Sequence, residues 1–199
     1  MFKEGDAATS PFLFERVKGT KERDCAMRSQ RLSYRPLQGA DAGRIAALAG
    51  EWDIARMTSR IPHPYSLIDA DLWIGSLGID EFVRGVEHDG DLIGAVGYIE
   101  GEGAQAEIGY WIGKPWWGNG YATEAAGTLM RYCFADAGFR ELTCGHFADN
   151  PASQRVINKL GFRHVGTGAQ WCEARKSQVP TVRYVRRRPL LAGWRRPTR

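Results

Sequence analysis

The sequence predicts an α+β domain, built on a mixed, mostly antiparallel central sheet of about seven strands that is flanked by helices. Three observations lead to this prediction. Two strand-like runs flank an Asp-Gly pair at Asp89–Gly90, which is a strong signal for a β-hairpin. A helical spacing of apolar residues runs from Ala122 to a capping glycine, Gly138. A shorter helix begins at Asn150 and Pro151, which are favoured at the N-cap and at the first helical position.

The chain of 199 residues is long enough to bury one substantial core, and we expect one domain. Its patterned part occupies residues 31–188. Residues 1–30 mix charged residues, glycine and serine, lack the apolar core of a signal peptide, and are expected to form a flexible extension. Residues 189–199 are expected to form a basic C-terminal tail.

The N-terminal part of the domain is predicted as a strand followed by two helices. Apolar and polar residues alternate over Leu32–Leu37, as in a half-buried strand, and Asp41 precedes an Ala- and Leu-rich helix. The segment Ile61–Tyr65 contains two prolines that interrupt regular structure, and Asp69 is expected to cap the second helix. The other strands are expected at Phe82–Glu87, Leu92–Ile99, Ala106–Ile112, Glu141–Phe147, Arg163–Gly168 and Thr181–Val185.

The composition argues against a metal site and against a membrane span. No pair of cysteines is spaced as CxxC and none has histidines at metal-ligand spacing, so we expect reduced thiols in a cytoplasmic protein. No run approaches eighteen apolar residues, the length that a spanning helix needs. The four histidines fall on separate predicted elements. The tryptophans are expected mostly in the core, namely Trp52, Trp73, Trp111, Trp116, Trp117 and Trp171.

Positive charge gathers at the C-terminal end of the chain. The formal net charge is +4, but nine cations follow Glu173, the last acidic residue, so the remainder carries a net charge of −5. Such an arginine-rich end has two readings: a solvated terminus, which we favour, or a weak contact with RNA or the ribosome through counterion release.

Two glycines directly precede the predicted helix that starts near Ala122. In Trp117-Gly118-Asn119-Gly120-Tyr121-Ala122, consecutive backbone N–H groups are expected to point outward, where the helix dipole adds to them and a phosphate fits. An ordinary tight turn is the other reading. The turn lacks the Gly-Lys-Ser/Thr ending of a P-loop and the Gly-x-Gly-x-x-Gly of a dinucleotide fold.

Three blocks resemble, in their order and spacing, the Gcn5-related N-acetyltransferase (GNAT) family, and within it the Rim-type branch of RimJ/RimL-like enzymes. They are Glu107–Ile112, Trp116–Ala125 and Asn150–Phe162, and the resemblance covers about Leu32 to Arg187. It implies the GNAT acyl-CoA N-acyltransferase fold. It also implies transfer of an acetyl group from acetyl-CoA to a primary amine, on a protein N-terminus or a small molecule, by direct attack in a ternary complex. A monomer or a homodimer is expected.

By this resemblance, backbone amides of Gly118 through Ala122 hold the pyrophosphate of coenzyme A. Backbone N–H groups near Trp111 or Ile112 stabilise the oxyanion of the acyl transfer. The family usually places Gln or Arg where this chain has Trp117, which weakens a side-chain contact to phosphate but leaves the backbone cradle. The expected cofactor-binding residues are Trp111, Ile112, Trp117, Gly118, Asn119, Gly120, Tyr121, Ala122, Thr123 and Asn150.

Two residues are candidates for moving protons. Glu107 shares a strand face with Gly109 and Trp111 and is the candidate base for a protonated amine, acting directly or through water. The competing reading is a surface carboxylate. The resemblance places Ser153 near the thioester sulfur, where it protonates the departing thiolate, and the competing reading is an exposed first-turn serine. Asn150 has both a capping role and a cofactor role.

The resemblance leaves the acceptor amine open. A non-catalytic module that binds acyl-CoA for sensing or assembly is the alternative function on the same fold. A nucleic-acid-binding protein that acts through the arginine-rich end is a third possibility.

Overall fold

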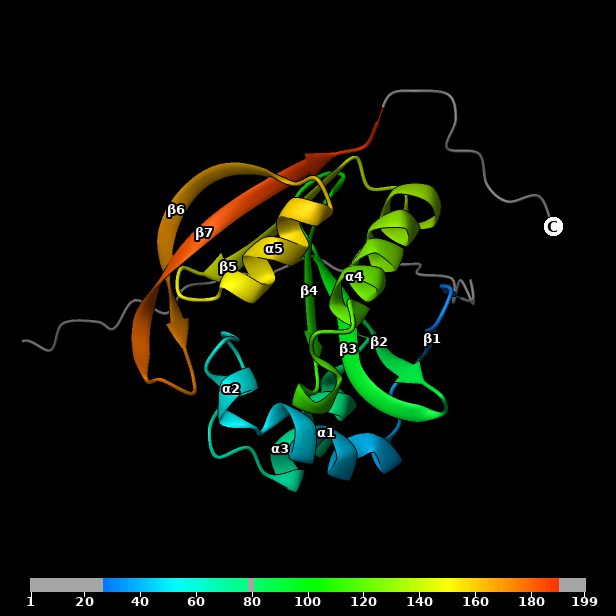
Figure 1. Cartoon of the computed structure of the whole chain (residues 1–199), viewed down its shortest axis with the longest axis vertical. Coiled ribbons are helices and arrows are strands. Elements are labelled where there is room, and N and C mark those ends of the chain that lie inside the picture. Colours follow the sequence, from blue (N-terminus) through cyan, green and yellow to red (C-terminus); the bar gives the residue numbers. More distant parts are fainter. Residues whose placement is uncertain (1–26, 79–80, 190–199) are drawn as a thin grey trace, which may run out of the picture.

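The computed structural model describes residues 27–78 and 81–189 (Figure 1). These residues form one seven-stranded sheet in the order β1-β2-β3-β4-β5-β7-β6. All neighbouring strands are antiparallel except β4 and β5, which are parallel. This confirms the predicted mixed, mostly antiparallel sheet. The predicted extension and tail lie outside the described residues, apart from residues 27–30 and Pro189.

The strands are β1 (Ser33–Arg35), β2 (Glu81–His88), β3 (Asp91–Glu100), β4 (Gln105–Ile112), β5 (Glu141–Phe147), β6 (Arg163–Cys172) and β7 (Ser177–Arg187). The α-helices are α1 (Ala42–Ala49), α2 (Trp52–Ala55), α3 (Leu67–Ser76), α4 (Tyr121–Tyr132) and α5 (Pro151–Lys159). Short 3-10 turns lie at Gly39–Asp41 (η1) and Lys114–Trp116 (η2), and a π-helical turn at Cys133–Ala137 (η3) extends α4.

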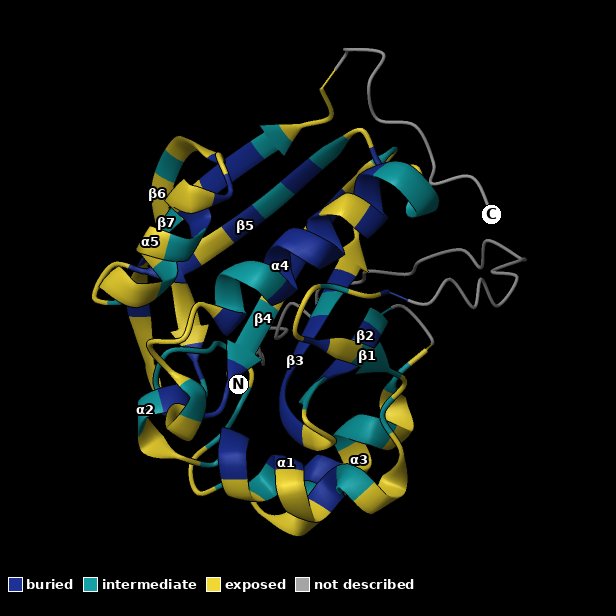
Figure 2. Ribbon diagram, turned by 45° about the vertical axis from the view of Figure 1, so that its right-hand side comes forward, coloured by how far each residue is buried: buried dark blue, intermediate teal, exposed yellow. Residues whose placement is uncertain are grey.

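Helices cover the two faces of the sheet in separate clusters. Helices α4 and α5 pack on one face, and their fully buried Leu129 and Ile157 belong to the same core cluster as Ile93 of β3. Helices α1 and α3 pack with Leu92, the neighbour of Ile93, and therefore on the opposite face. Figure 2 shows the buried residues concentrated along β3, β4 and the inner side of α4. The middle of the sheet is thus enclosed between helices.

The predicted hairpin is present between β2 and β3. Its turn residues Asp89 and Gly90 have φ angles of 51° and 86°. Two left-handed residues in succession are the signature of a two-residue hairpin turn, and this explains why Asp-Gly predicted it. The pairing then runs from His88–Asp91 back to Glu81–Ile99.

Three expectations about local structure were wrong. Helix α3 is capped by Ser66, whose side chain accepts the N–H of Asp69, so Asp69 is the third residue of a capping box rather than the cap. Strands β6 and β7 extend beyond their predicted ends, because their ladder continues through exposed residues to Cys172–Ser177. Three of the tryptophans expected in the core are more than two-fifths exposed, namely Trp52, Trp117 and Trp171.

Some cations of the basic C-terminal end have acidic partners in the part of the chain that the structure describes. Arg175, Lys176 and Arg187 are not without counter-charges, because they pair with Asp149, Glu173 and Glu141 at 2.8, 2.9 and 2.8 Å. These cations lie on or beside the β6–β7 hairpin. The fold brings acidic residues from earlier in the chain to them, which their order in the sequence does not reveal.

Met27 is buried at 6% exposure in the main core with Leu32, so the folded part begins at least as early as Met27. No described helix is both long enough and apolar enough to cross a membrane. Within residues 27–78 and 81–189, no group of three or more potential ligand side chains is arranged to hold a metal ion.

Candidate active site between strands β4 and β5

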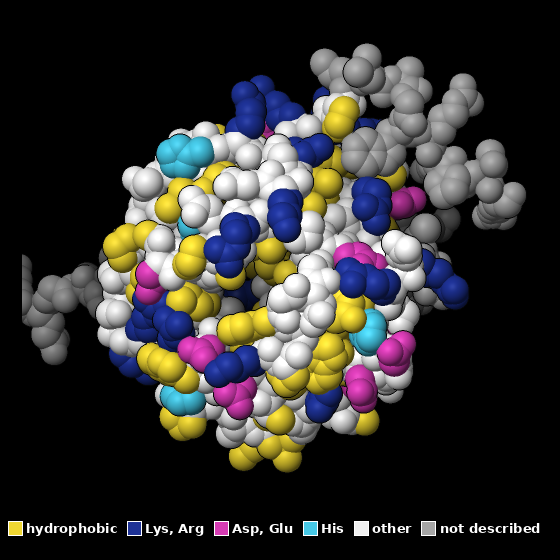
Figure 3. Space-filling model, in the orientation of Figure 1, with side chains coloured by type: hydrophobic (Ala, Val, Ile, Leu, Met, Phe, Trp, Pro, Cys, Tyr) yellow, Lys and Arg dark blue, Asp and Glu magenta, His cyan; other side chains and the backbone are white. Residues whose placement is uncertain are grey.

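Strands β4 and β5 are paired only where they begin. The parallel register joins residues 105–107 to residues 141–143 and stops there. Further along the described strands, β4 is paired only with β3, and β5 only with β7. The two strands therefore diverge toward their C-terminal ends (Figure 1), and Figure 3 shows the surface hollowed in this region, with hydrophobic side chains around the hollow.

The backbone of β4 turns hydrogen-bonding groups into this gap. Residues of an antiparallel pair alternate between those bonded to the partner strand and those whose N–H and C=O face away from it. The N–H of Gly113 donates to the carbonyl of Ile93 at 2.7 Å. Because bonded residues alternate, Trp111, two residues before Gly113, is also bonded to β3. Tyr110 and Ile112 therefore direct their backbone N–H and C=O toward the gap. Of the two predicted oxyanion donors, only the N–H of Ile112 has this direction.

A glycine loop leads from the end of β4 into α4. Gly118 and Gly120 have φ angles of 82° and 81°, in the left-handed region that side chains disfavour. Gly120 is the N-cap of α4, and no side chain caps this helix. In the described structure, the backbone N–H groups of residues 118–123 have no acceptor. Together with the positive end of the helix dipole, they form an arrangement that can hold an anion.

Side chains within the loop fix its shape. The indole N–H of Trp117 donates to the carbonyl of Ile112 at 2.6 Å, and the Asn119 amide donates to the carbonyls of Trp116 and Trp117 at 3.3 and 3.2 Å. The polar groups that Trp117 and Asn119 use in these bonds are directed at the loop itself. Both residues were expected to bind the cofactor, and the structure shows side chains that organise the loop, whose backbone remains open.

Helix α5 brings a hydroxyl to the same gap. Asn150 caps the helix by accepting the N–H of Ser153 on its side-chain oxygen at 3.0 Å, which confirms the predicted N-cap. The hydroxyl of Ser153 lies 2.9 Å from that of Tyr110 on β4. Burial raises the pKa of Tyr110, although its hydrogen bond to Ser153 acts in the opposite direction. Tyr110 is therefore a protonated phenol that can donate to Ser153.

Glu107 stands at the last paired position of β4 and is exposed. Its side chain projects from the face opposite to Tyr110, as the alternation predicted. Arg60 lies within its electrostatic reach: the pKa of Arg60 is raised, mainly by its hydrogen bond to Glu81 and further by the Glu107 carboxylate. The carboxylate of Glu107 and the hydroxyl of Ser153 thus approach the gap from opposite faces of the sheet.

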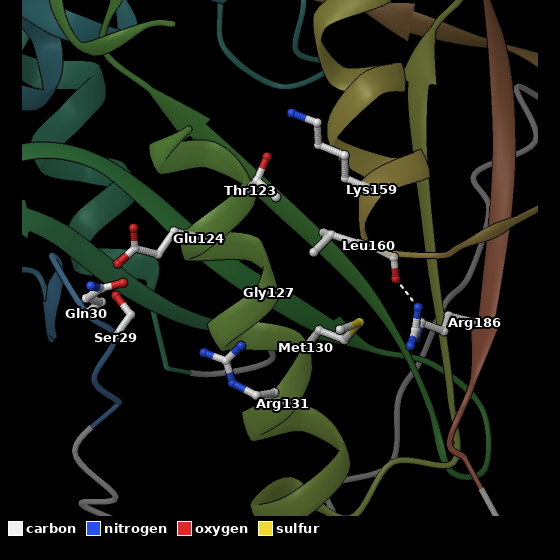
Figure 4. A pocket seen from close by; sticks show the side chains of 10 residues that line it. All are labelled: Ser29, Gln30, Thr123, Glu124, Gly127, Met130, Arg131, Lys159, Leu160 and Arg186. Atoms are coloured by element: carbon white, nitrogen blue, oxygen red, sulfur yellow. Dashed lines mark hydrogen bonds between the residues drawn. The ribbon is translucent and has the colours of Figure 1, made fainter. Parts of the chain in front are cut away.

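A second hollow adjoins the glycine loop. A cavity of about 490 Å³ lies between α4 and α5 and is lined by Thr123 of the first turn of α4 (Figure 4). Three cations surround it. Arg131 donates to the hydroxyl of Thr128 at 2.8 Å and Arg186 donates to the carbonyl of Leu160, whereas the ammonium group of Lys159 has no hydrogen bond or ion pair to any described residue. The cavity can therefore attract a second anionic group.

The fold thus brings most predicted site residues to one gap, and it adds residues that sequence reasoning missed. Sequence reasoning did not single out Tyr110 or Lys159. The hydroxyl of Tyr110 was a usable signal, because a buried tyrosine needs a hydrogen-bond partner. Lys159 had no comparable signal, because its position beside α4 follows from the packing of the two helices.

Comparison with known proteins places the chain among acetyltransferases. The family model described as acetyltransferase (GNAT) domain matches residues 31–163. The uncharacterized N-acetyltransferase YoaA of Bacillus subtilis is 35% identical over 83 residues, which are 41% of this chain and 47% of YoaA. YdaF of the same organism, which carries the provisional name of a ribosomal N-acetyltransferase, is 31% identical over 148 residues, or 69% of this chain and 81% of YdaF. The chain thus matches about half the length of the first relative.

Solved structures share the fold at low sequence identity. RimJ of Mycobacterium smegmatis, in complex with CoA-disulfide, has a TM-score of 0.70 and 18% identity, over 78% of this chain and 81% of RimJ. The ribosomal-protein-S5-alanine acetyltransferase of Vibrio fischeri has a TM-score of 0.71 and 16% identity, over 87% of this chain and all of the other. At such identities the likeness establishes the architecture.

Proposed function

The chain belongs to the acetyltransferase (GNAT) family, and from this premise we propose that it transfers an acetyl group from acetyl-CoA to a primary amine. The observation that carries the proposal is the convergence of two helix N-termini on one gap. The glycine loop and α4 follow β4, and Asn150 and α5 follow β5. Such an opening offers anion-binding N–H groups beside free strand edges.

The chain's own groups fit coenzyme A, which supplies the activated acyl group when bound. The N–H groups of residues 118–123 receive the pyrophosphate, with the α4 dipole behind them. The free edge of β4 offers the backbone N–H and C=O of Tyr110 to the gap, where they would hold the amides of the pantetheine arm. The cavity with Lys159 and Arg131 receives the phosphorylated nucleotide end. Cysteine or metal chemistry is not needed for these contacts.

The acyl group is oriented at the end of the β4 edge. The N–H of Ile112 faces the gap and is the group placed to stabilise negative charge on the acyl oxygen. Trp111 contributes its side chain to the opposite face, where it packs with α1 and α3. This division lets one strand bind the cofactor on one side and shape the acceptor site on the other.

Two groups hold the protons of the reaction. Glu107 accepts a proton from the ammonium form of the acceptor, directly or through water, because only the neutral amine is a nucleophile. Ser153 gives its hydroxyl proton to the departing sulfur and regains one, through water, from the attacking nitrogen, which loses a proton as the amide forms, while Tyr110 supports Ser153 by donating to its Oγ. Because Glu107 and Ser153 lie on opposite faces, the amine and the thiol need not compete for one group.

We propose a protein N-terminus as the acceptor, and a small-molecule amine is the second candidate. The name of YdaF favours the first, since that relative matches over most of its length. The arginine-rich end of this chain is assigned as a solvated terminus, with a weak contact to the ribosome or RNA by charge attraction as the second reading, and the enzyme acts in the cytoplasm as a monomer or homodimer. An acyl-CoA sensor without catalysis is the alternative function.

The decisive experiment is calorimetric titration of the purified protein with acetyl-CoA, followed by thiol release against peptide N-termini, polyamines and aminoglycosides. We expect binding together with acceptor-dependent release of one thiol per acetylated amine. Binding with no release on any acceptor would favour the sensor. Absence of binding would refute the assignment of the glycine loop and the function that depends on it.

A further inference from the structure

Arg31, in the segment that precedes β1, makes an unusually complete set of contacts with the start of α4. Its backbone N–H and its Nε both donate to the carboxylate of Glu124 at 2.8 Å, and its Nη2 lies 2.7 Å from the same carboxylate. Its Nη1 donates to the backbone carbonyl of Asn119 at 3.1 Å. The guanidinium also stacks over the ring of Tyr121, at 4.6 Å from the centroid. One side chain thus contacts the loop, the first helical residue and the first turn.

The hydrogen bond from Arg31 to the carbonyl of Asn119 determines where the N–H of Gly120 points. The peptide between Asn119 and Gly120 is trans, so its C=O and N–H point in opposite directions. Arg31 holds the carbonyl on its own side and thereby directs the N–H of Gly120 away from itself. This N–H belongs to the group of donors without an acceptor in the described structure. Because glycine at 120 permits more than one orientation of this peptide, the bond from Arg31 favours the observed one and adds to the contacts that Trp117 and Asn119 make within the loop.

The pairing with Glu124 solves an electrostatic problem. Glu124 lies in the first turn of α4, beside the N–H groups that we assign to a pyrophosphate. An unpaired carboxylate there repels an anionic ligand. Burial of Glu124 acts to raise its pKa, but the hydrogen bonds from the Arg31 backbone, the Ser29 side chain and the Arg31 side chain together outweigh burial, and the pKa of Glu124 is lowered. The carboxylate is therefore charged, and Arg31 compensates that charge directly.

The segment that carries Arg31 is anchored to the body of the protein. Met27 is buried in the main core, and the hydroxyl of Ser29 lies 3.2 Å from that of Tyr34 on β1. The N–H of Ser29 donates to the carbonyl of Leu32 at 3.2 Å. These contacts fix both sides of Arg31, so that its guanidinium reaches α4 from a rigid base.

We propose that Arg31 is a positioning residue for the phosphate site: it sets the Asn119–Gly120 peptide and neutralises Glu124, so that the glycine loop is ready for the pyrophosphate of coenzyme A. This inference rests on the proposed function. It makes Arg31, far from the glycine loop in sequence, part of the cofactor site as a residue that acts through the loop and through Glu124.

The test compares binding and turnover in the full-length chain. Arg31→Ala is expected to weaken coenzyme A binding about tenfold or more, as the loss of a charge-assisted hydrogen-bond network does. The kcat/KM for acetyl-pantetheine, which has no pyrophosphate, is expected to stay at the wild-type value. Arg31→Lys keeps the positive charge but not the planar guanidinium, and its affinity for coenzyme A should lie between those of Arg31→Ala and the wild type. Arg28→Ala, which removes an exposed cation from the same segment, is the matched control.

A double variant separates the two parts of the proposal. Arg31→Ala combined with Glu124→Gln should recover part of the lost coenzyme A affinity. The unpaired carboxylate of Glu124 is then removed, but the hydrogen bond to the Asn119 carbonyl is still missing. Should Arg31→Ala prove too unstable to purify, Arg31→Lys gives the same comparison between the two acyl donors.

Wild-type affinity for coenzyme A in the Arg31 variants would overturn the inference and leave the proposed function intact. An equal loss on acetyl-CoA and acetyl-pantetheine would also overturn it, since that pattern reports a general structural defect. A wild-type protein that does not bind coenzyme A would refute the proposed function first and this inference with it.

Discussion

The hydroxyl of Tyr110 on β4 lies 2.9 Å from the hydroxyl of Ser153 on α5, and the two side chains bridge the gap where β4 and β5 diverge. Because burial keeps Tyr110 protonated, its O–H can donate to the Ser153 hydroxyl oxygen, and in that arrangement the Ser153 proton is left for another acceptor. In the proposed reaction that acceptor is the departing sulfur.

Removal of either hydroxyl should slow turnover, and the two losses should not add. We expect Ser153→Ala to lower kcat about a hundredfold, in the range of a lost general acid, and Tyr110→Phe about fivefold, the equivalent of one hydrogen bond. The double variant should be no slower than Ser153→Ala, since Tyr110 acts through Ser153. Tyr98→Phe, which removes a buried tyrosine hydroxyl of β3 that packs against Phe82, is the control. Additive losses would show that Tyr110 does not act through Ser153.

Replacement of Glu107 should affect catalysis and spare cofactor binding. Glu107→Gln is expected to lower kcat/KM about a hundredfold, because the amine must then lose its proton to solvent. Coenzyme A affinity in calorimetry should be unchanged, since the carboxylate lies on the face away from α4. Glu100→Gln, an exposed glutamate at the end of β3, is the matched control. A pH–rate profile identical to that of the wild type would exclude Glu107 as the base.

Substitution of Gly120 should abolish cofactor binding. Gly120 has a φ of 81°, which a side chain adopts at a cost of about 1–2 kcal/mol. Gly120→Trp adds a large side chain beside the N–H cradle, and we expect no measurable coenzyme A binding by calorimetry. Gly103→Ala imposes a similar left-handed strain in the turn after β3, where φ is 67° and no atom lies within 4 Å. It should reduce thermal stability and leave coenzyme A affinity intact, and unchanged affinity in Gly120→Trp would show that the phosphate site is misplaced.

Lys159 should contribute through its charge. Lys159→Ala is expected to weaken coenzyme A binding several-fold and to reduce the salt dependence of binding, because one cation in contact with the nucleotide end is lost. Lys176→Ala removes an exposed lysine that pairs with Glu173 in the β6–β7 hairpin, and both the affinity and its salt dependence should stay as in the wild type. If the salt dependence of binding is unaltered in Lys159→Ala, the nucleotide end does not bind in this cavity.

The buried thiols should be unreactive in the folded protein. Cys133, Cys144 and Cys172 are buried and free. Burial, and to a smaller extent the Glu107 carboxylate, raises the pKa of Cys144 to about 12, and burial raises the pKa of Cys133 as well. A thiolate is the reactive form, so raising the pH from 7 to 9 should not expose either residue to iodoacetamide. Mass mapping of labelled peptides checks this, and fast labelling of Cys144 at pH 9 would contradict the burial of β5.

Local signals in the sequence predicted the elements well where a single residue type dictates the backbone. Asp89–Gly90 predicted the hairpin because both positions need positive φ, and Asn150 predicted the start of α5 because its side chain caps the helix. Asp69 was wrongly predicted as the cap of α3, because both residues of a capping box are polar and either can look like the cap. The structure shows that the earlier residue, Ser66, is the cap.

Long-range features were beyond local signals. The Arg31–Glu124 ion pair joins residues separated by 93 positions, and no sequence pattern links them. The choice of Ile112 over Trp111 as the donor into the gap depends on the phase of the β3–β4 ladder, which a shift of one residue would reverse. The family resemblance located the glycine loop and the catalytic strand, whereas the contacts that hold them follow from the fold.

The short paired region between β4 and β5 also divides the sheet into two parts that can fold separately. On one side of it, β1 to β4 contain two hairpin-type connections between neighbours in sequence, a low-contact-order arrangement that can form early. On the other side, β6 and β7 form a hairpin, but β5 is joined to it through β7, and its partners lie more than thirty residues later, so the β5–β7 ladder requires closure of a long loop. Only three residue pairs connect the two halves of the sheet. Native-state hydrogen exchange should therefore resolve two cooperative units, with the β5–β7 unit opening at lower free energy than the β2–β4 unit.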